Sequence, residues 1–185
     1  MMEHAKLIAG QTMLLQGTGG VSIFGLQLAR MMGIQVIITS SSDDKIARAK
    51  ALGANHGINY KTRPDWEKAA LGFTDGRGVD HVVEVGGAAT LARSFGAIRV
   101  GGKISMIGGL TGPATELNPA LIFARRANVQ GISVGSMQMF EAMSRAIAAS
   151  GIKLVLDKVF PFDEALAYRH MAAGAHFGKI VIRVA

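Results

Sequence analysis

Short apolar runs alternate with amphipathic segments along most of the chain. The apolar runs have the length of strands, and we expect them at residues 12–16, 35–39, 56–59, 80–85, 102–107 and 128–133. Helical periodicity fills the intervals, at about 21–32, 42–52, 65–71, 88–98, 119–127 and 137–150. This alternation is typical of a parallel sheet with helices on both faces. The pattern predicts a doubly wound α/β fold with a six-stranded parallel sheet.

The pattern changes after residue 152. A strand at 154–160, a helix from Asp163 to residue 173 and a final strand at 179–184 follow the last helix of the predicted sheet. A strand–helix–strand addition to a complete sheet needs another surface on which to pack. We therefore divide the chain into a domain at 1–152 and a C-terminal segment at 153–185.

Composition narrows the possible partners. The formal net charge of +7 favours an anionic partner. The longest basic run is Arg125–Arg126, and only 6% of residues are aromatic, so the basic–aromatic surface typical of nucleic-acid binding is missing from the pattern. A small phosphorylated ligand fits the composition better than a nucleic acid does.

The sequence indicates neither a membrane-spanning segment nor a metal site. No apolar run approaches the roughly 20 residues that span a bilayer. The chain has no cysteine, and its five histidines show no metal-type spacing, so we expect no zinc to be bound by this chain. The lack of cysteine is compatible with a reducing compartment, and we expect a soluble, cytoplasmic protein.

The most specific local feature is the run Gly17–Thr18–Gly19–Gly20–Val21–Ser22. It follows a predicted strand and opens a predicted helix, which is the context of a dinucleotide-binding loop. Gly17 permits the tight turn, Gly19 allows close approach of a diphosphate, and the amides at Gly20 and Val21 begin the helix. Ser22 replaces the third glycine of the fingerprint, and a plain strand-to-helix turn is the alternative interpretation.

Residues after the second strand bear on the choice of cofactor. NAD-selective domains place an acid at the tip of this strand, whereas Ser40 and Ser41 follow it here. Their hydroxyls and the cation of Lys45 suit a 2′-phosphate, so we expect NADP, with NAD as the alternative. Asp43 and Asp44 weaken this expectation, although acids also favour the first turn of a helix.

With these residues assembled, the chain resembles the medium-chain dehydrogenase/reductase superfamily, particularly its zinc-type alcohol dehydrogenases and quinone oxidoreductases. The resemblance rests on QGTGGVSIFGLQLAR, SSSDDKIARAKALGANHGINY, GRGVDHVVEVGG, GGKISMIGG and AHFGKIVI, which cover almost all of the chain. It implies that residues 1–152 are an NAD(P)-binding Rossmann domain. It also implies that the whole protein transfers a hydride between NADPH and an alcohol, aldehyde, ketone or quinone.

The resemblance implies roles for particular residues. Ser41, Lys45 and Tyr60 fall where zinc-free quinone reductases hold the 2′-phosphate. Residues that would line the ribose and nicotinamide are Gly86, Gly87, Gly108, Gly109, Ser133, Val134 and Gly135. The glycine pairs have plain strand-end turns as their alternative. The family also implies a homodimer that pairs the sixth strands.

The family places substrate and any catalytic zinc in a GroES-like barrel that precedes the Rossmann domain. The resemblance therefore implies that this chain is the cofactor-binding part of an oxidoreductase, inactive alone, whose segment 153–185 packs on that barrel. No residue here is assigned a catalytic role, including Glu84, which is an acid within an apolar strand. A non-catalytic dinucleotide-binding module remains an alternative. A methyltransferase-like domain is disfavoured because the second strand lacks an acid at its tip.

Overall fold

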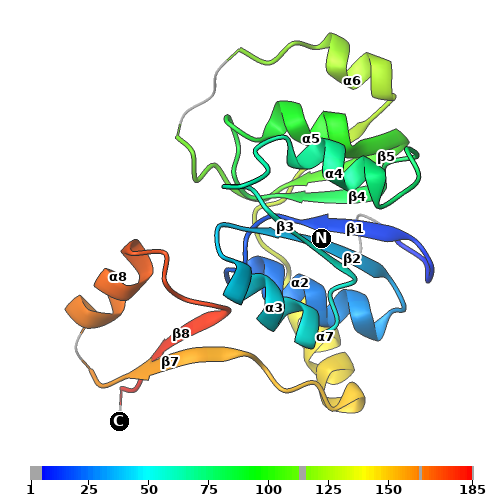
Figure 1. Ribbon diagram of the computed structural model, residues 1–185. Helices are drawn as coiled ribbons and strands as arrows, with labels where there is room; N and C mark the ends of the chain where they lie inside the picture. The colour runs from blue at the N-terminus through cyan, green and yellow to red at the C-terminus, as the bar shows by residue number, and fades with distance from the viewer. Residues whose placement is uncertain (1–5, 113–115, 163, 185) are drawn as a thin grey trace.

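A parallel sheet of six strands forms the centre of the protein in a computed structural model that describes residues 6–112, 116–162 and 164–184 (Figure 1). The strand order is β3-β2-β1-β4-β5-β6, and every neighbouring pair is parallel. The strands are β1 (Thr12–Leu15), β2 (Gln35–Ser40), β3 (His56–Asn59), β4 (Val79–Glu84), β5 (Ile98–Met106) and β6 (Asn128–Gly131). The predicted α/β Rossmann fold, doubly wound around a six-stranded sheet, is confirmed.

Helices cover both faces of the sheet and enclose two apolar clusters. The helices α2 (Gly20–Met31) and α3 (Asp43–Ala51) pack on one face, where Ile23, Leu26 and Ala49 meet side chains of β1 and β2. The helices α4 (Trp66–Gly72), α5 (Leu91–Ala97) and α6 (Ala120–Arg125) pack on the other face. Strands buried on both faces explain why their sequences are continuous apolar runs.

Helix α3 shows how local sequence sets an element's bounds. The Ser42 hydroxyl accepts a hydrogen bond from the Lys45 amide, which caps the helix at its start. Asp43 and Asp44 occupy the first turn, where their charge complements the helix dipole. Gly53 ends the helix with φ of 105°, a conformation that favours glycine. The predicted cap and terminating glycine both lie where the sequence indicates.

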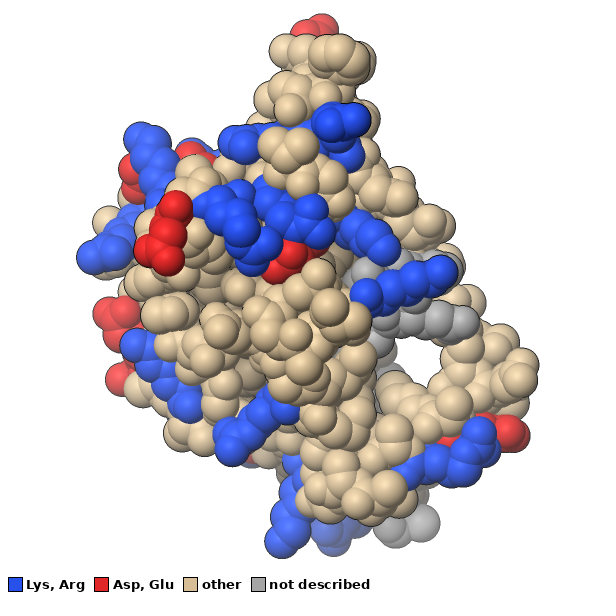
Figure 2. Space-filling model, turned by 90° about the vertical axis from the view of Figure 1, so that its right-hand side faces the viewer, with Lys and Arg blue, Asp and Glu red and all other residues tan. Residues whose placement is uncertain are grey.

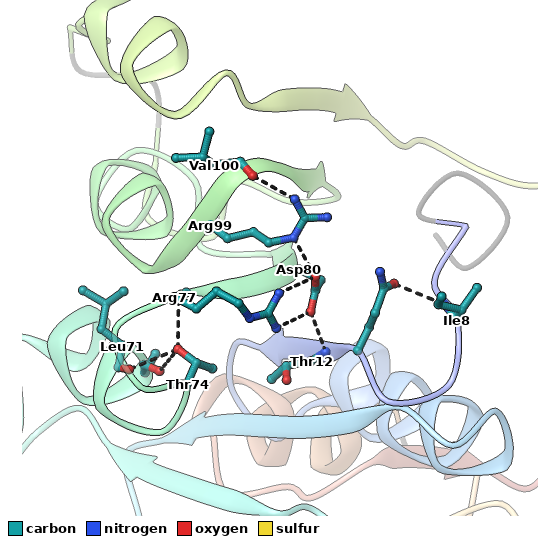
Figure 3. Close-up of polar contacts among 11 residues, drawn as sticks. Ile8, Thr12, Leu71, Thr74, Arg77, Asp80, Arg99 and Val100 are labelled. Carbon is teal, nitrogen blue, oxygen red and sulfur yellow. Dashed lines mark hydrogen bonds and ion pairs between the residues drawn. The ribbon is translucent and has the colours of Figure 1, made fainter.

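The starts of the central strands are tied together by a buried acid, Asp80 (Figure 3). Its carboxylate accepts hydrogen bonds from both terminal nitrogens of Arg77, from Nε of Arg99 and from the Thr12 amide. Burial raises the pKa of Asp80, but these donors outweigh burial and lower the pKa to about 2. The network links β1, β4 and β5 at the end of the sheet opposite the candidate site.

Some Lys and Arg side chains cluster on the surface, and others stand alone. Figure 2 shows a group of Lys and Arg side chains near the middle of one face, with acidic side chains beside it and further basic groups towards the edges. The ion pairs of Arg77 and Arg99 with the buried carboxylate of Asp80 show that part of the positive charge of the protein is used within the fold.

The C-terminal segment forms a small unit beside the main sheet. Its strands β7 (Leu156–Phe160) and β8 (Lys179–Ile182) pair in parallel, and α8 (Glu164–Ala172) connects them. The expected helix start at Asp163 lies outside the described residues. Phe177 is 1% exposed and belongs to the apolar cluster beneath α2 and α3, so part of this segment is anchored on the Rossmann domain.

Other apolar side chains lie at the surface. Helix α7 (Met137–Ser150) contains no buried residue, and Met137 and Phe140 are more than half exposed. Leu156 and Phe162 of the C-terminal segment are also exposed. None of the helices formed by the described residues is long and apolar enough to cross a bilayer.

Candidate dinucleotide-binding site

A cavity of about 840 Å³ opens where the strand order reverses, between β1 and β4. Its walls come from the segments that follow the carboxyl ends of β1, β2 and β4, with further residues from the C-terminal segment. Open parallel sheets bind ligands at this reversal, because the neighbouring connections leave to opposite faces and separate there. The cavity therefore lies where the fold itself favours a ligand.

The glycine-rich loop forms one wall of this cavity, with Gly17, Gly19, Gly20 and Val21 among its lining residues. Gly17 has φ of 72°, and its amide donates to the Thr39 hydroxyl at 3.1 Å, which holds the turn against β2. Gly19 is the N-cap of α2 and carries no capping side chain, and the first turn of α2 has no acid. The helix therefore presents amides and its positive dipole end to the cavity.

Ser22 stands where the fingerprint has its third glycine, and the structure accounts for it. Its side chain is buried, and the hydroxyl donates a hydrogen bond of 2.6 Å to the carbonyl oxygen of Gln16. This bond satisfies a buried polar group and connects the end of β1 with the first turn of α2. The serine thus fits the close strand–helix contact that the motif requires.

The residues expected to hold a 2′-phosphate gather at one end of the cavity. Ser40, Ser41, Lys45 and Tyr60 all line it. The Lys45 ammonium donates to the carbonyl oxygen of Gly174 at 2.5 Å, which holds this cation at the cavity wall. Burial lowers the pKa of Lys45; nearby Asp157 opposes this effect, and Arg48 adds to it.

The two acids that follow β2 do not line the cavity. Asp43 accepts a hydrogen bond from the side-chain amide of Asn59 at 3.0 Å, which directs its carboxylate towards β3. Asp44 is exposed in the first turn of α3. The part of the cavity at the tip of β2 therefore contains hydroxyls and one ammonium among its described residues.

Glu84 is the centre of a buried network below the cavity. Its carboxylate accepts five hydrogen bonds, from the side chains of Gln16, Thr90 and Ser94 and from the amides of Gly86 and Gly87. The side-chain oxygen of Gln16 accepts from the Gly86 amide as well. Glu84 is fully buried, so the network fixes the turn after β4 against β1 and α5.

The glycines after β4 and β5 approach each other closely. Gly86 lines the cavity, and a Cβ atom on Gly87, whose φ is 87°, would lie only 2.8 Å from Cα of Gly109. A Cβ atom on Gly108 would lie 2.8 Å from the carbonyl oxygen of Val85. These two turns therefore pack backbone against backbone, which requires glycine at both positions.

The expected residues Ser133, Val134 and Gly135 lie between β6 and α7 and are not among the residues that line this cavity. Val134 is 89% exposed. Conversely, several residues that line the cavity were not indicated by any motif in the sequence. Examples are Trp66, Arg93, Thr111 and His176. Their distance along the chain from the glycine-rich loop explains why the sequence pattern did not identify them.

Comparison with known proteins identifies the family. The zinc-binding dehydrogenase family matches residues 20–149. The chain belongs to this family. The match confirms the resemblance to the cofactor-binding domain of the medium-chain dehydrogenase/reductase superfamily.

Individual relatives extend the match over nearly the whole chain. A zinc-type alcohol dehydrogenase-like protein of Schizosaccharomyces pombe is 47% identical over 187 residues, covering 98% of this chain and 54% of that protein. A crystal structure of an NAD-dependent alcohol dehydrogenase is 32% identical with a TM-score of 0.92, covering 100% of this chain and 54% of that one. A mycobacterial protein in complex with NADPH is 25% identical with a TM-score of 0.81, covering 95% of this chain and 58% of that one. The chain spans about half the length of the relatives it matches.

The family's name refers to zinc, and the side chains allow a direct test of fit. Within residues 6–112, 116–162 and 164–184, no three His, Asp or Glu side chains come together as a zinc site requires, and the sequence contains no cysteine. The described residues therefore do not fit a zinc ion.

Proposed function

We propose that this chain is the NAD(P)-binding part of an oxidoreductase that transfers a hydride between NADPH and an alcohol, aldehyde, ketone or quinone. The observation that carries the proposal is the cavity at the strand reversal, bounded by an uncapped helix N-terminus and by Lys45. The family match supports it, since relatives along nearly the whole chain carry the names of alcohol dehydrogenases.

The residues of this chain bind and orient the dinucleotide in the proposed reaction. The amides at Gly19, Gly20 and Val21 hold the diphosphate, and Gly86, Gly108 and Gly109 lie against the ribose and nicotinamide side. Ser133, Val134 and Gly135 remain proposed backbone contacts of the nicotinamide amide. The nicotinamide ring supplies the hydride chemistry when bound. The protein contributes orientation and a surface that excludes water.

The proposed cofactor preference is for NADPH. Ser40, Ser41, Lys45 and Tyr60 would hold the 2′-phosphate through hydrogen-bond donors and one positive charge. The contact between Asp43 and Asn59 supports this preference, because it removes a carboxylate from the position that repels the phosphate.

Substrate is proposed to bind to residues outside this chain, in a domain on which the segment 153–185 would also pack. The exposed apolar side chains of that segment and of α7 support such a contact. We also propose a homodimer through β6, whose four residues are exposed and form the last strand in the order of the sheet. Sedimentation of the purified protein as a dimer, and dissociation by a proline in β6, would test this contact.

Calorimetric titration with NADPH and NADH tests the proposed function. Binding of NADPH more tightly than NADH, with one site per chain, is the expected result. The chain alone is expected to bind cofactor without oxidising alcohols at ordinary enzyme rates. Absence of binding to both cofactors would reject the proposal. A dinucleotide-binding module without catalysis would show the same binding but no gain of activity when combined with the domain proposed to hold the substrate.

A further inference from the structure

The C-terminal segment reaches the glycine-rich loop of the proposed cofactor site. The Gly178 amide donates to the carbonyl oxygen of Thr18 at 3.0 Å, and Gly178 also forms an isolated parallel bridge with Gly19. Gly178 has φ of 81°, and a Cβ atom there would lie 2.6 Å from the carbonyl oxygen of Val155. Only glycine therefore allows the segment to pass this closely between its own backbone and the loop.

This approach places the His176 ring at the loop. His176 lines the cavity together with Met171, Ala172 and Gly174 of the same segment. A Cβ atom built on Gly19, the N-cap of α2, would lie 3.6 Å from Nε2 of His176, so this ring nitrogen lies near the start of the helix. The imidazole is thus beside the amides that would hold a diphosphate.

The surroundings of the ring determine which nitrogen carries the hydrogen. Nδ1 of His176 is buried and has no hydrogen-bond partner among the described residues. A buried donor without an acceptor is costly, so the neutral tautomer with its hydrogen on Nε2 is favoured. In that tautomer the hydrogen is on Nε2, the ring nitrogen that lies near Gly19.

The charges around His176 keep the ring neutral. Burial lowers the pKa of His176 below its ordinary value of 6.5, and Lys45 lowers it further. Asp157 on β7 raises the pKa, whereas His170 on α8 and Lys179 on β8 lower it. At pH 7 the ring is therefore a neutral donor, in contrast to the ammonium of Lys45 on the same cavity wall.

We propose that His176 is a diphosphate-binding residue, which the C-terminal segment brings to the cofactor cavity and which donates a hydrogen bond from Nε2 to a phosphate oxygen. The proposal rests on the proposed dinucleotide site. It adds a phosphate-binding side chain from outside the strand–loop–helix motif. The segment 153–185 then has a role in cofactor binding as well as in any contact with another domain.

The test uses ligands that separate the two phosphate positions. NADP⁺ carries both the diphosphate and the 2′-phosphate, whereas adenosine 2′-monophosphate carries only the latter. His176→Phe keeps a ring but removes the donor, and it is expected to weaken NADP⁺ binding about tenfold because the hydrogen bond is made to a charged group. Binding of adenosine 2′-monophosphate is expected to remain within twofold. His176→Gln, whose side-chain amide can donate from a similar position, is expected to restore most of the NADP⁺ affinity.

A control variant and a measurement on the wild-type protein distinguish loss of the hydrogen bond from misfolding of the His176 variant. His170→Phe, in the neighbouring helix, is expected to leave NADP⁺ affinity unchanged. In the wild-type protein, inorganic pyrophosphate is expected to shift the imidazole NMR signals of His176 and not those of His56, which stacks on Phe73. Equal NADP⁺ affinity of His176→Phe and wild type, or no response of His176 to pyrophosphate, would overturn the inference. Failure of the wild type to bind NADP⁺ would instead reject the proposed function.

Discussion

Replacing Glu84 by glutamine tests the buried network that supports the cavity. The amide oxygen of glutamine can still accept from Thr90 and from the amides of Gly86 and Gly87, which meet Oε1 of the glutamate. The amide NH₂ would then face the side-chain NH₂ of Gln16, which donates to Oε2 at 2.7 Å in the wild type. Two donors would thus oppose each other in a site without exposure to solvent.

The expected cost follows from these contacts. Loss of the Gln16 hydrogen bond to a charged acceptor costs about 1.5–3 kcal/mol, and the three donors that meet Oε1 lose the charge that strengthens their bonds. The Ser94 hydroxyl can rotate and accept, which limits the loss on its side. We expect Glu84→Gln to lower the free energy of unfolding by about 3 kcal/mol. Because Gly86 lines the cavity, NADPH affinity is expected to fall as well.

Urea unfolding followed by circular dichroism measures this change, with the slope against urea unchanged if the native state is retained. Glu141→Gln on α7 is the matched control, because Glu141 is exposed and its replacement is expected to alter stability by less than about 0.5 kcal/mol. A loss below about 1 kcal/mol for Glu84→Gln would show that the network does not bear on the stability of the turn. If the variant were destabilised but kept full NADPH affinity, the network would support the fold without affecting cofactor binding.

Three further predictions concern the site and the fold. Lys45→Ala is expected to weaken NADPH binding about tenfold and to leave NADH binding within twofold, since only NADPH offers a 2′-phosphate; equal losses in calorimetry would contradict the proposed preference. Asp80→Asn is expected to lower stability at pH 7 by about 2 kcal/mol, because the pKa of Asp80 falls from 3.8 to about 2 on folding. This lowered pKa stabilises the fold above pH 4 and loses its effect as the pH falls towards 2, so unfolding curves of variant and wild type should converge there; a difference independent of pH would refute the assignment. Gly87→Ala is expected to cost about 2 kcal/mol, from a left-handed backbone and contact with Gly109, whereas Gly72→Ala, in open space, is expected to be tolerated in thermal unfolding.

Local patterns in the sequence identify the central strands of the sheet because β1 and β4 are buried on both faces. The bounds predicted for β3 agree with the structure, and β1 and β2 differ by a single residue. Strand β5 begins at Ile98 rather than at 102, and its pairing with β4 shifts register between Val79 and His81. Such an irregularity depends on the neighbouring strand, so periodicity along one segment does not reveal it.

Contacts between distant segments explain what the sequence did not reveal. The glycine-rich loop is a local motif, and its turn is encoded within six residues. Glu84, by contrast, meets donors from Gln16, which follows β1, and from Ser94 in α5, so its isolated position in an apolar strand indicates only a buried acid. His176 and Phe177 reach the cavity and the core from beyond residue 152, and no local pattern in the C-terminal segment indicates these contacts. The contacts of the sixth-strand connection at Ser133–Gly135 depend on a ligand and stay a prediction.

The central claim is that the amides at the start of α2 hold the diphosphate of a nicotinamide dinucleotide. A crystal structure of the protein grown with excess NADP⁺ tests it most directly. The account predicts a diphosphate against Gly19, Gly20 and Val21, with the 2′-phosphate beside Ser41 and Lys45. A cavity that stays empty at saturating NADP⁺, or one filled by the chain itself, would contradict the account.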